Sequence, residues 1–64
     1  MRHTELWARL ESALGPAVVK TWADYQAISD LGSRTVTEAL ADGIPPKQIW
    51  AAVWATLELP EKDK

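Results

Sequence analysis

Apolar residues recur at helical spacing in four segments of the chain, and glycine and proline residues separate these segments. The apolar face of the first segment consists of Leu6, Trp7, Leu10 and Leu14. Thr4 is suited to cap this helix at its start, and Gly15-Pro16 is suited to end it. Glu5 and Arg9 are spaced as a favourable i,i+4 pair on the other side of the helix. The pattern therefore predicts a helix over about residues 4–14.

The second segment follows Pro16, a residue that is tolerated in the first turn of a helix because its missing N–H is not needed there. Its apolar positions are Val18, Trp22 and Tyr25 on one face, with Val19 and Ile28 at the edges. This spacing predicts a helix over about residues 17–28.

The third segment is short and begins with Thr35-Val36-Thr37-Glu38, which matches the S/T-x-x-E pattern of a capping box. It predicts a helix over about residues 35–42, ended by Gly43. The fourth segment starts at Pro45-Pro46 and predicts a helix over about residues 46–57. It carries two adjacent i,i+4 stripes, so that its apolar arc is unusually wide: Trp50 and Trp54 form one stripe, and Ile49, Val53 and Leu57 form the other.

These segments predict an all-α fold, a compact bundle of three longer helices plus one short helix, in a single domain over residues 1–60. Residues 61–64 are charged and are predicted to form a frayed tail. We expect a core organised around the four tryptophans, with Trp50 mainly inside and Trp54 at least partly exposed. The other predicted core residues are Trp7, Leu10, Leu14, Val18, Trp22, Tyr25, Ile28, Leu31, Val36, Leu40, Ile44, Ile49, Val53 and Leu57.

Composition limits how this fold can be stabilised. A chain of 64 residues buries a modest fraction of its surface, and this one has no cysteine and a single histidine, His3. Disulfides and a structural zinc site are therefore excluded. Dense packing of the four tryptophans, or association with another chain, remains as the source of extra stability.

The charge balance disfavours general binding to nucleic acid, because the formal net charge is −2 and the pI is about 5.2. Charged residues interrupt the first twenty positions, so no signal peptide is expected, and no apolar run approaches the roughly 20 residues that span a bilayer. The absence of cysteine fits a reducing compartment. We expect a cytoplasmic protein without a membrane segment.

Several short motifs follow one another along the chain: Arg2-His3-Thr4-Glu5-Leu6-Trp7, Thr21-Trp22-Ala23, Leu31-Gly32-Ser33-Arg34-Thr35-Val36, Glu38-Ala39-Leu40 with Gly43, and Lys47 with Trp50-Ala51-Ala52-Val53. As a set they resemble a family of short actinobacterial proteins catalogued as a domain of unknown function, family three thousand and forty-six. The resemblance extends to about Pro60. It implies an actinobacterial cytosolic protein and supplies no activity.

Family members are often encoded near recombinase and recombination-regulator genes, so the resemblance implies a weak link to DNA maintenance. The chain departs from the family pattern at Pro45, where a capping residue such as Asp is commoner. It also departs at Trp54, where a smaller residue is usual. The second departure sets Trp54 apart from the core that the family shares.

The third and fourth predicted helices, joined by a turn at Gly43-Ile44, raise the alternative of a DNA-binding helix–turn–helix. However, Glu38 and Asp42 occupy positions where such a unit usually has apolar residues. In the would-be recognition helix, Lys47 and Gln48 alone could reach a phosphate or a base edge. A plain helical hairpin is the favoured interpretation.

Two groups of residues are candidate binding sites. The wide arc of the fourth helix makes Trp50, Trp54 and Lys47 a candidate partner surface, because an uncovered tryptophan pair is a good binding hot spot. The alternative is that both stripes belong to the core. Arg34, Thr35 and Glu38 could hold a small anion at a helix start. The alternative is that Thr35 and Glu38 cap the helix and Arg34 pairs with Asp30 or Glu38, which explains their spacing without a ligand.

No catalytic motif is present. The candidate catalytic acid–base groups besides His3 are Asp24, Tyr25, Asp30 and Glu38, and none is spaced as a nucleophile with its base, a metal set or a phosphate-binding loop. We therefore expect no enzyme, no cofactor, no metal and no small-molecule substrate. The favoured function is a protein-interaction or accessory module, acting as a homodimer or with an unidentified protein partner. The alternative is a weakly DNA-associated helix–turn–helix protein linked to recombination or DNA maintenance.

Overall fold

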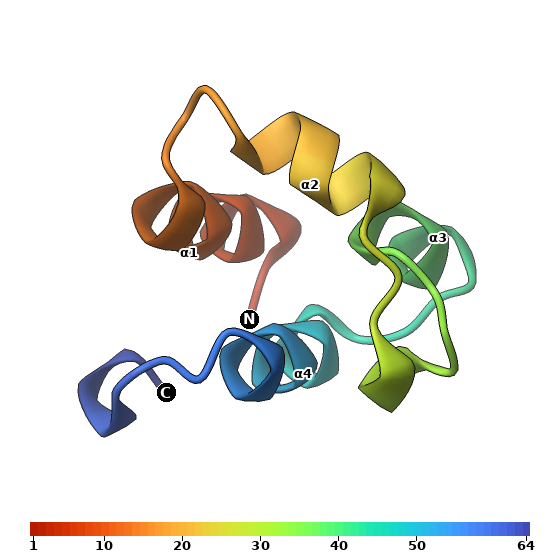
Figure 1. The fold of residues 1–64 in the computed structure, drawn as a ribbon. Helices are drawn as coiled ribbons and strands as arrows, with labels where there is room; N and C mark the ends of the chain where they lie inside the picture. Colours follow the sequence, from red (N-terminus) through yellow and green to blue (C-terminus); the bar gives the residue numbers. More distant parts are fainter.

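The structure is a computed structural model that describes residues 1–64, and it consists of helices joined by turns. Its elements are α1 (His3–Leu14), α2 (Val19–Tyr25), the 3-10 turn η1 (Ser29–Leu31), α3 (Val36–Ala41), α4 (Pro46–Thr56) and the 3-10 turn η2 (Glu61–Asp63). In Figure 1, α1 lies above α4, α2 crosses the top of the molecule, and α3 closes the right side. The predicted all-α fold is confirmed.

Helix α1 begins one residue earlier than predicted. Arg2 occupies the N-cap position and its side chain makes no capping hydrogen bond, so Thr4 lies inside the helix and is not the predicted cap. The end of the helix agrees with the prediction. Gly15 has a positive φ of 89°, and its N–H donates to the Glu11 carbonyl. This φ lies in a region that side-chain-bearing residues rarely adopt.

Helix α2 is much shorter than the predicted 17–28. Residues 16–18 form a turn before it, and residues 26 and 27 are extended after it. Ile28 is not helical: its N–H donates to the Arg34 carbonyl at 2.9 Å, and the two residues form an isolated antiparallel bridge. The chain thus reverses through η1, and this reversal buries the Ile28 side chain completely.

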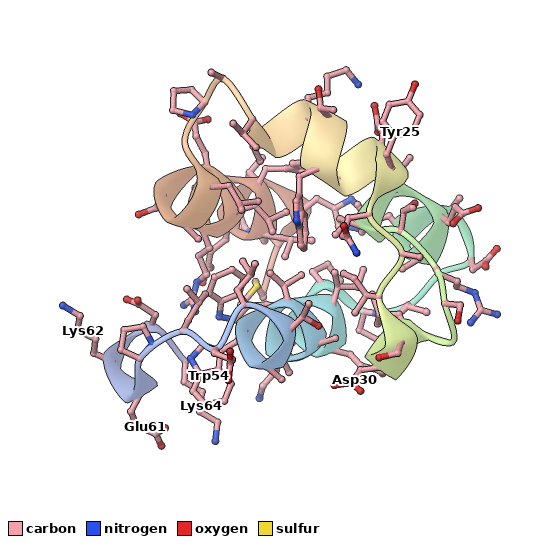
Figure 2. All side chains as sticks on the ribbon, viewed as in Figure 1. Tyr25, Asp30, Trp54, Glu61, Lys62 and Lys64 are labelled. Carbon is pink, nitrogen blue, oxygen red and sulfur yellow. The ribbon has the colours of Figure 1, made fainter.

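The predicted inward face of this segment is wrong at both ends, since Val18 is 50% exposed and Tyr25 is 82% exposed. Figure 2 shows Tyr25 pointing away from the molecule. The buried side of α2 is Ala23, with Val19 and Trp22 packed partly against the core. Because successive helical residues are about 100° apart, choosing Val18 in place of Val19 rotates the predicted face by about a quarter turn.

Helix α3 has the predicted start. The Thr35 Oγ1 accepts from the Glu38 N–H at 3.1 Å, and the Glu38 carboxylate accepts from the Thr35 N–H at 2.9 Å. This reciprocal pair confirms the capping box. Helix α4 begins at Pro46 as predicted and ends at Thr56, one residue before the predicted end.

The core is aliphatic and is not organised around four tryptophans. Its eleven residues are Leu6, Leu10, Ala23, Ile28, Leu31, Val36, Ala39, Ile49, Trp50, Ala52 and Val53. Trp50 alone among the tryptophans belongs to this cluster, and Trp7, Trp22 and Trp54 pack against it with part of their surface exposed. Leu14, Leu40, Ile44 and Leu57 are half-buried, which is less than predicted.

Three core residues are small: Ala23, Ala39 and Ala52. The sequence predicts Ala39 to face inward with Val36 and Leu40, whereas Ala23 and Ala52 are absent from the predicted core. Leu6 was also missed, although it shares a face with Leu10. The resulting molecule measures 27 × 23 × 21 Å, and its radius of gyration of 10.5 Å is close to the roughly 11 Å expected of a folded domain of this length.

The structure differs from the predicted frayed tail at residues 61–64. Glu61–Asp63 form η2, which lies beside α4 on the side away from α3 (Figure 1). Since all four side chains are exposed, the segment is held by main-chain bonds and charge, which sequence periodicity does not reveal.

Candidate functional site

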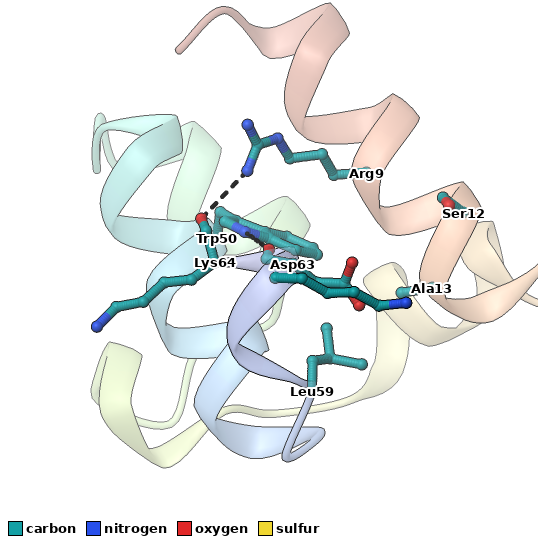
Figure 3. A pocket seen from close by; sticks show the side chains of 8 residues that line it. Arg9, Ser12, Ala13, Trp50, Leu59, Asp63 and Lys64 are labelled. Atoms are coloured by element: carbon teal, nitrogen blue, oxygen red, sulfur yellow. Dashed lines mark hydrogen bonds between the residues drawn. The ribbon is translucent and has the colours of Figure 1, made fainter.

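The candidate site lies where α1, α4 and η2 meet, and Trp50 is at its centre. Trp50 is on α4 and is 4% exposed. Its indole Nε1 donates to the main-chain carbonyl of Asp63 at 3.0 Å, as Figure 3 shows. The guanidinium carbon of Arg9, from α1, is 5.8 Å from the centroid of the Trp50 ring, within the range of a cation–π contact.

Trp54 lies one turn after Trp50 on α4 and remains partly exposed, in agreement with the prediction. Its indole Nε1 donates to the carbonyl of Pro60 at 2.9 Å. The ammonium of Lys64 is 5.3 Å from the centroid of the Trp54 ring, and Figure 2 shows the two side chains together at the C-terminal turn. Both indole N–H groups therefore bind main-chain oxygens of the segment that follows α4.

Arg9 connects the two ends of the chain at this site. Its Nη2 donates to the Glu5 carboxylate at 3.1 Å, and its Nη1 donates to the Lys64 carbonyl at 3.3 Å. The sequence predicts the first bond, an i,i+4 pair on α1. It gives no signal for the second, which joins residues 55 positions apart. Arg9 and Lys64 are thus site residues that sequence reasoning missed.

Two open hollows flank the Arg9–Lys64 contact. The first has a volume of about 330 Å³, and its lining includes Arg9, Trp50, Leu59, Lys62 and Lys64. The second has a volume of about 390 Å³, and its lining includes Lys47, Ala51, Trp50, Arg9 and Lys64. The structure therefore brings Lys47 and Trp50 to one hollow, with Trp54 beside it.

This face differs in charge from the rest of the molecule. Of seven basic and nine acidic residues in the chain, the two linings contain four basic residues and two acidic ones. The linings thus carry a net charge of +2, and the remaining residues carry −4. The basic residues are Arg9, Lys47, Lys62 and Lys64.

The second candidate cluster, at the start of α3, is occupied by bonds within the protein. Thr35 and Glu38 bind each other's main-chain N–H groups. Arg34 donates from Nε to the Asp42 carboxylate at 2.7 Å and from Nη1 to the Leu31 carbonyl at 2.8 Å, so its partner is neither of the predicted Asp30 and Glu38. These bonds favour a capping role for the cluster over anion binding.

The backbone conformation of residue 32 favours glycine there. A Cβ built at Gly32 would lie 2.6 Å from the Arg34 Nη1, and Gly32 has a positive φ of 72°. Any larger residue would displace the guanidinium and strain the turn between η1 and α3.

The remaining polar chemistry lies between α2 and α3. The Thr37 hydroxyl donates to the Asp24 carboxylate at 2.7 Å, and the Lys20 ammonium lies 3.2 Å from the same carboxylate. The hydrogen bond from Thr37, supported by that from Lys20, holds the pKa of Asp24 below its ordinary value. No three His, Cys, Asp or Glu side chains are grouped to hold a metal ion, and no helix has the length and apolar character needed to cross a membrane.

Comparison with known proteins gives a family without an activity. No curated protein and no solved structure is significantly similar to this chain. The family model described as "Protein of unknown function (DUF3046)" matches residues 1–62, nearly the whole chain, and this is the family that its motifs resemble. The chain therefore belongs to the DUF3046 family of proteins of unknown function.

Proposed function

We propose that this protein is an interaction module that binds an acidic segment of a partner protein on the face formed by α1, α4 and η2. The observation that carries the proposal is the gathering of four basic side chains around Trp50 on a molecule that is otherwise acidic. Complementary charge of this kind selects an acidic partner and speeds the encounter. A second copy of the chain, whose other surfaces are acidic, is one form that such a partner can take.

Trp54 supplies most of the exposed tryptophan surface of the proposed interface, because Trp50 is 4% exposed and presents little of its ring to the hollows. Trp50 lines both hollows, and Trp54 is partly exposed next to it. Tryptophan and arginine are enriched among the residues that dominate binding energies, and here Arg9 lies over the Trp50 ring. The proposal assigns binding and no reaction: Ser12 lines the first hollow, but its hydroxyl takes part in none of the side-chain hydrogen bonds of the structure.

The DNA-binding alternative has less support. A recognition helix needs polar side chains on its free face. The exposed residues of α4 are Lys47, Gln48, Ala51, Ala55 and Thr56, with Trp50 turned into the core. Half of the basic residues of the site come from the segment after α4, outside the would-be helix–turn–helix.

The proposal is tested by fluorescence anisotropy with a labelled peptide of eight glutamates, at increasing salt, beside a peptide of eight lysines and a labelled DNA duplex. We expect the glutamate peptide to bind and to dissociate with added salt. Lys47→Gln should weaken this binding about two- to fivefold, as loss of one exposed ion pair does.

Lys20→Gln is the matched control, because Lys20 is an exposed helical lysine outside both hollows. It should leave the affinity unchanged. Equal affinities of the two variants, or no binding of the glutamate peptide at low salt, would overturn the proposal. Tight binding of the duplex would favour the DNA alternative. Light scattering at high protein concentration measures the oligomeric state: a dimer indicates that the partner is a second copy of the chain, and a monomer indicates a different protein.

A further inference from the structure

The segment over residues 59–64, which we call the strap, forms part of the candidate site and is held there by its main chain. The carbonyls of Pro60, Asp63 and Lys64 accept hydrogen bonds from Trp54, Trp50 and Arg9 respectively. Beyond Leu59, which is half-buried, every strap side chain is exposed. The strap therefore docks through three directional bonds and has little apolar anchorage.

The strap also builds the walls of the first hollow. Of the eight residues that line this hollow, Leu59, Lys62, Asp63 and Lys64 belong to the strap, and Lys64 lines the second hollow as well. The strap thus supplies two of the four basic side chains of the site. Without it, the first hollow loses half of its lining, and the face loses two of its four basic residues and one of its two acidic residues, which lowers its net charge from +2 to +1.

A single residue sets the direction of the strap. Glu58 has a positive φ of 53°, and it occupies the position after the α4 C-cap where glycine is usual. The Glu58 N–H donates to the Ala55 carbonyl at 3.2 Å and the Leu59 N–H donates to the Trp54 carbonyl at 3.1 Å. These two bonds make a Schellman motif. A glutamate in this conformation is disfavoured, so the motif is strained at the point where the strap leaves the helix.

We infer that the strap forms half of the partner-binding surface and moves about a hinge at Glu58. Docking of the strap on Trp50 and Trp54 and binding of an acidic partner stabilise each other. The inference rests on the proposed function for the identity of the ligand. Docking brings Lys62 and Lys64 to Arg9 and Lys47, which raises the affinity for an acidic segment. By linkage, a bound acidic segment must favour the docked strap by the same factor.

A matched pair of variants at the hinge tests this inference in the full chain. Glu58→Gly and Glu58→Val remove the same carboxylate, but glycine accepts a positive φ and valine resists it. The conformational cost for a side-chain-bearing residue corresponds to a factor of roughly 5 to 30 in an equilibrium. Hydrogen exchange of the Trp50 and Trp54 indole N–H groups, followed by NMR, reports docking without any ligand.

We expect indole exchange at least about fivefold faster in Glu58→Val than in Glu58→Gly, and weaker binding of the eight-glutamate peptide by Glu58→Val. The Trp22 indole, which binds no strap carbonyl, is the internal control and should exchange equally in both. Addition of the peptide should slow exchange at Trp50 and Trp54 in Glu58→Val.

Three outcomes decide the matter. Equal indole exchange in the two variants would overturn the hinge. Different exchange with equal, measurable peptide affinity would overturn the coupling and leave the proposed function standing. Absence of peptide binding in the unmodified protein and in both variants would overturn the proposed function itself, and the coupling with it.

Discussion

Helix α4 carries two i,i+4 pairs, Ile49–Val53 and Trp50–Trp54, and the fold stabilises them by different forces. Ile49 and Val53 are completely buried in the core cluster. Trp50 and Trp54 lie toward the strap, where their indoles donate to two main-chain carbonyls and lie near Arg9 and Lys64. Ile49 and Val53 are held by apolar burial alone, whereas Trp50, itself a core residue, and Trp54 are held by directional bonds and nearby charges in addition to packing.

The two sides of α4 therefore differ in how easily the segments packed on them can detach without unfolding of the domain. Apolar burial is cooperative, because removing one core side chain weakens the contacts of all its neighbours. Hydrogen bonds at the surface contribute about 0.5–1.5 kcal/mol each and can be exchanged for bonds to water. The strap can therefore detach locally from the tryptophan side of α4 while the core, Trp50 included, stays folded.

The largest expected effect is on the aliphatic side. Ile49→Ala removes a fully buried side chain and leaves a cavity, which should reduce the free energy of unfolding by about 2–5 kcal/mol. A domain of this size has little stability in reserve, so we expect a large unfolded fraction in water, measured by urea denaturation with circular dichroism. Val18→Ala is the control and should change the free energy by less than about 0.5 kcal/mol, since Val18 is half exposed.

The next effect concerns the start of α3. Thr35→Ala removes the hydroxyl that accepts from the Glu38 N–H and should cost about 0.5–2 kcal/mol in the free energy of unfolding. Glu38→Gln keeps a side-chain oxygen for the Thr35 N–H and should cost much less. If both variants were equally destabilised, the charge of Glu38 and not the capping geometry would be what matters.

A smaller effect is expected on the tryptophan side. Trp54→Phe removes the N–H that donates to the Pro60 carbonyl, and we expect a loss of about 0.5–1.5 kcal/mol, expressed as faster amide exchange in residues 59–64. The midpoint of global unfolding should move little. Trp22→Phe makes the same chemical change in a tryptophan that has no strap bond, and it should leave exchange in the strap unaltered. If Trp54→Phe lowered the midpoint of global unfolding as strongly as it increased amide exchange in the strap, the two sides of α4 would not differ as we propose.

The smallest expected effect is on the pH dependence of stability, and it concerns Asp24, which lies between α2 and α3 and outside both sides of α4. The pKa of the Asp24 carboxyl is lower in the folded protein than in the unfolded chain. The ionised carboxylate therefore stabilises the fold at pH values above the unfolded pKa of about 3.9. This stabilisation is lost as the pH falls through the folded pKa. Thr37→Val removes the hydrogen bond that lowers this pKa and should raise it toward the ordinary value. An NMR titration of the Asp24 carboxyl carbon measures the change. Titration at an unchanged pKa would show that Lys20 alone sets it.

The sequence predicts the features that depend on neighbours within a few positions. Gly15-Pro16 and the stretch from Gly43 to Pro46 mark two of the breaks between helices, Thr35 and Glu38 form the predicted capping box, and Glu5 and Arg9 form the predicted pair. Each of these rests on groups at most four residues apart, whose geometry is fixed once a helix forms.

Periodicity gave less reliable results where the tertiary fold interrupts a helix. The pattern from Val18 to Ile28 is consistent with one long helix, but the chain turns out of the helix after Tyr25 so that Ile28 can pair with Arg34 and enter the core. Burial of Ile28 at the start of η1 outweighs the continued helical hydrogen bonds, and Tyr25 is left in solvent. The helical pattern of the sequence does not show which of the two is favoured, because the burial of Ile28 depends on the packing of η1 against α4, which are distant in the sequence.

By itself, then, the sequence determined the helical class, the helix breaks at Gly15 and Gly43, the capping box of α3 and the location of Trp50 and Trp54 on one stripe of α4. The tertiary structure alone decided that the core is aliphatic, that Arg9 meets Lys64 across 55 positions, and that the strap walls a basic hollow over Trp50. The physical reason is the range of the interactions. Propensity and capping act within a helical turn, whereas a surface made by α1, α4 and the strap exists once burial of the core has brought three distant segments together.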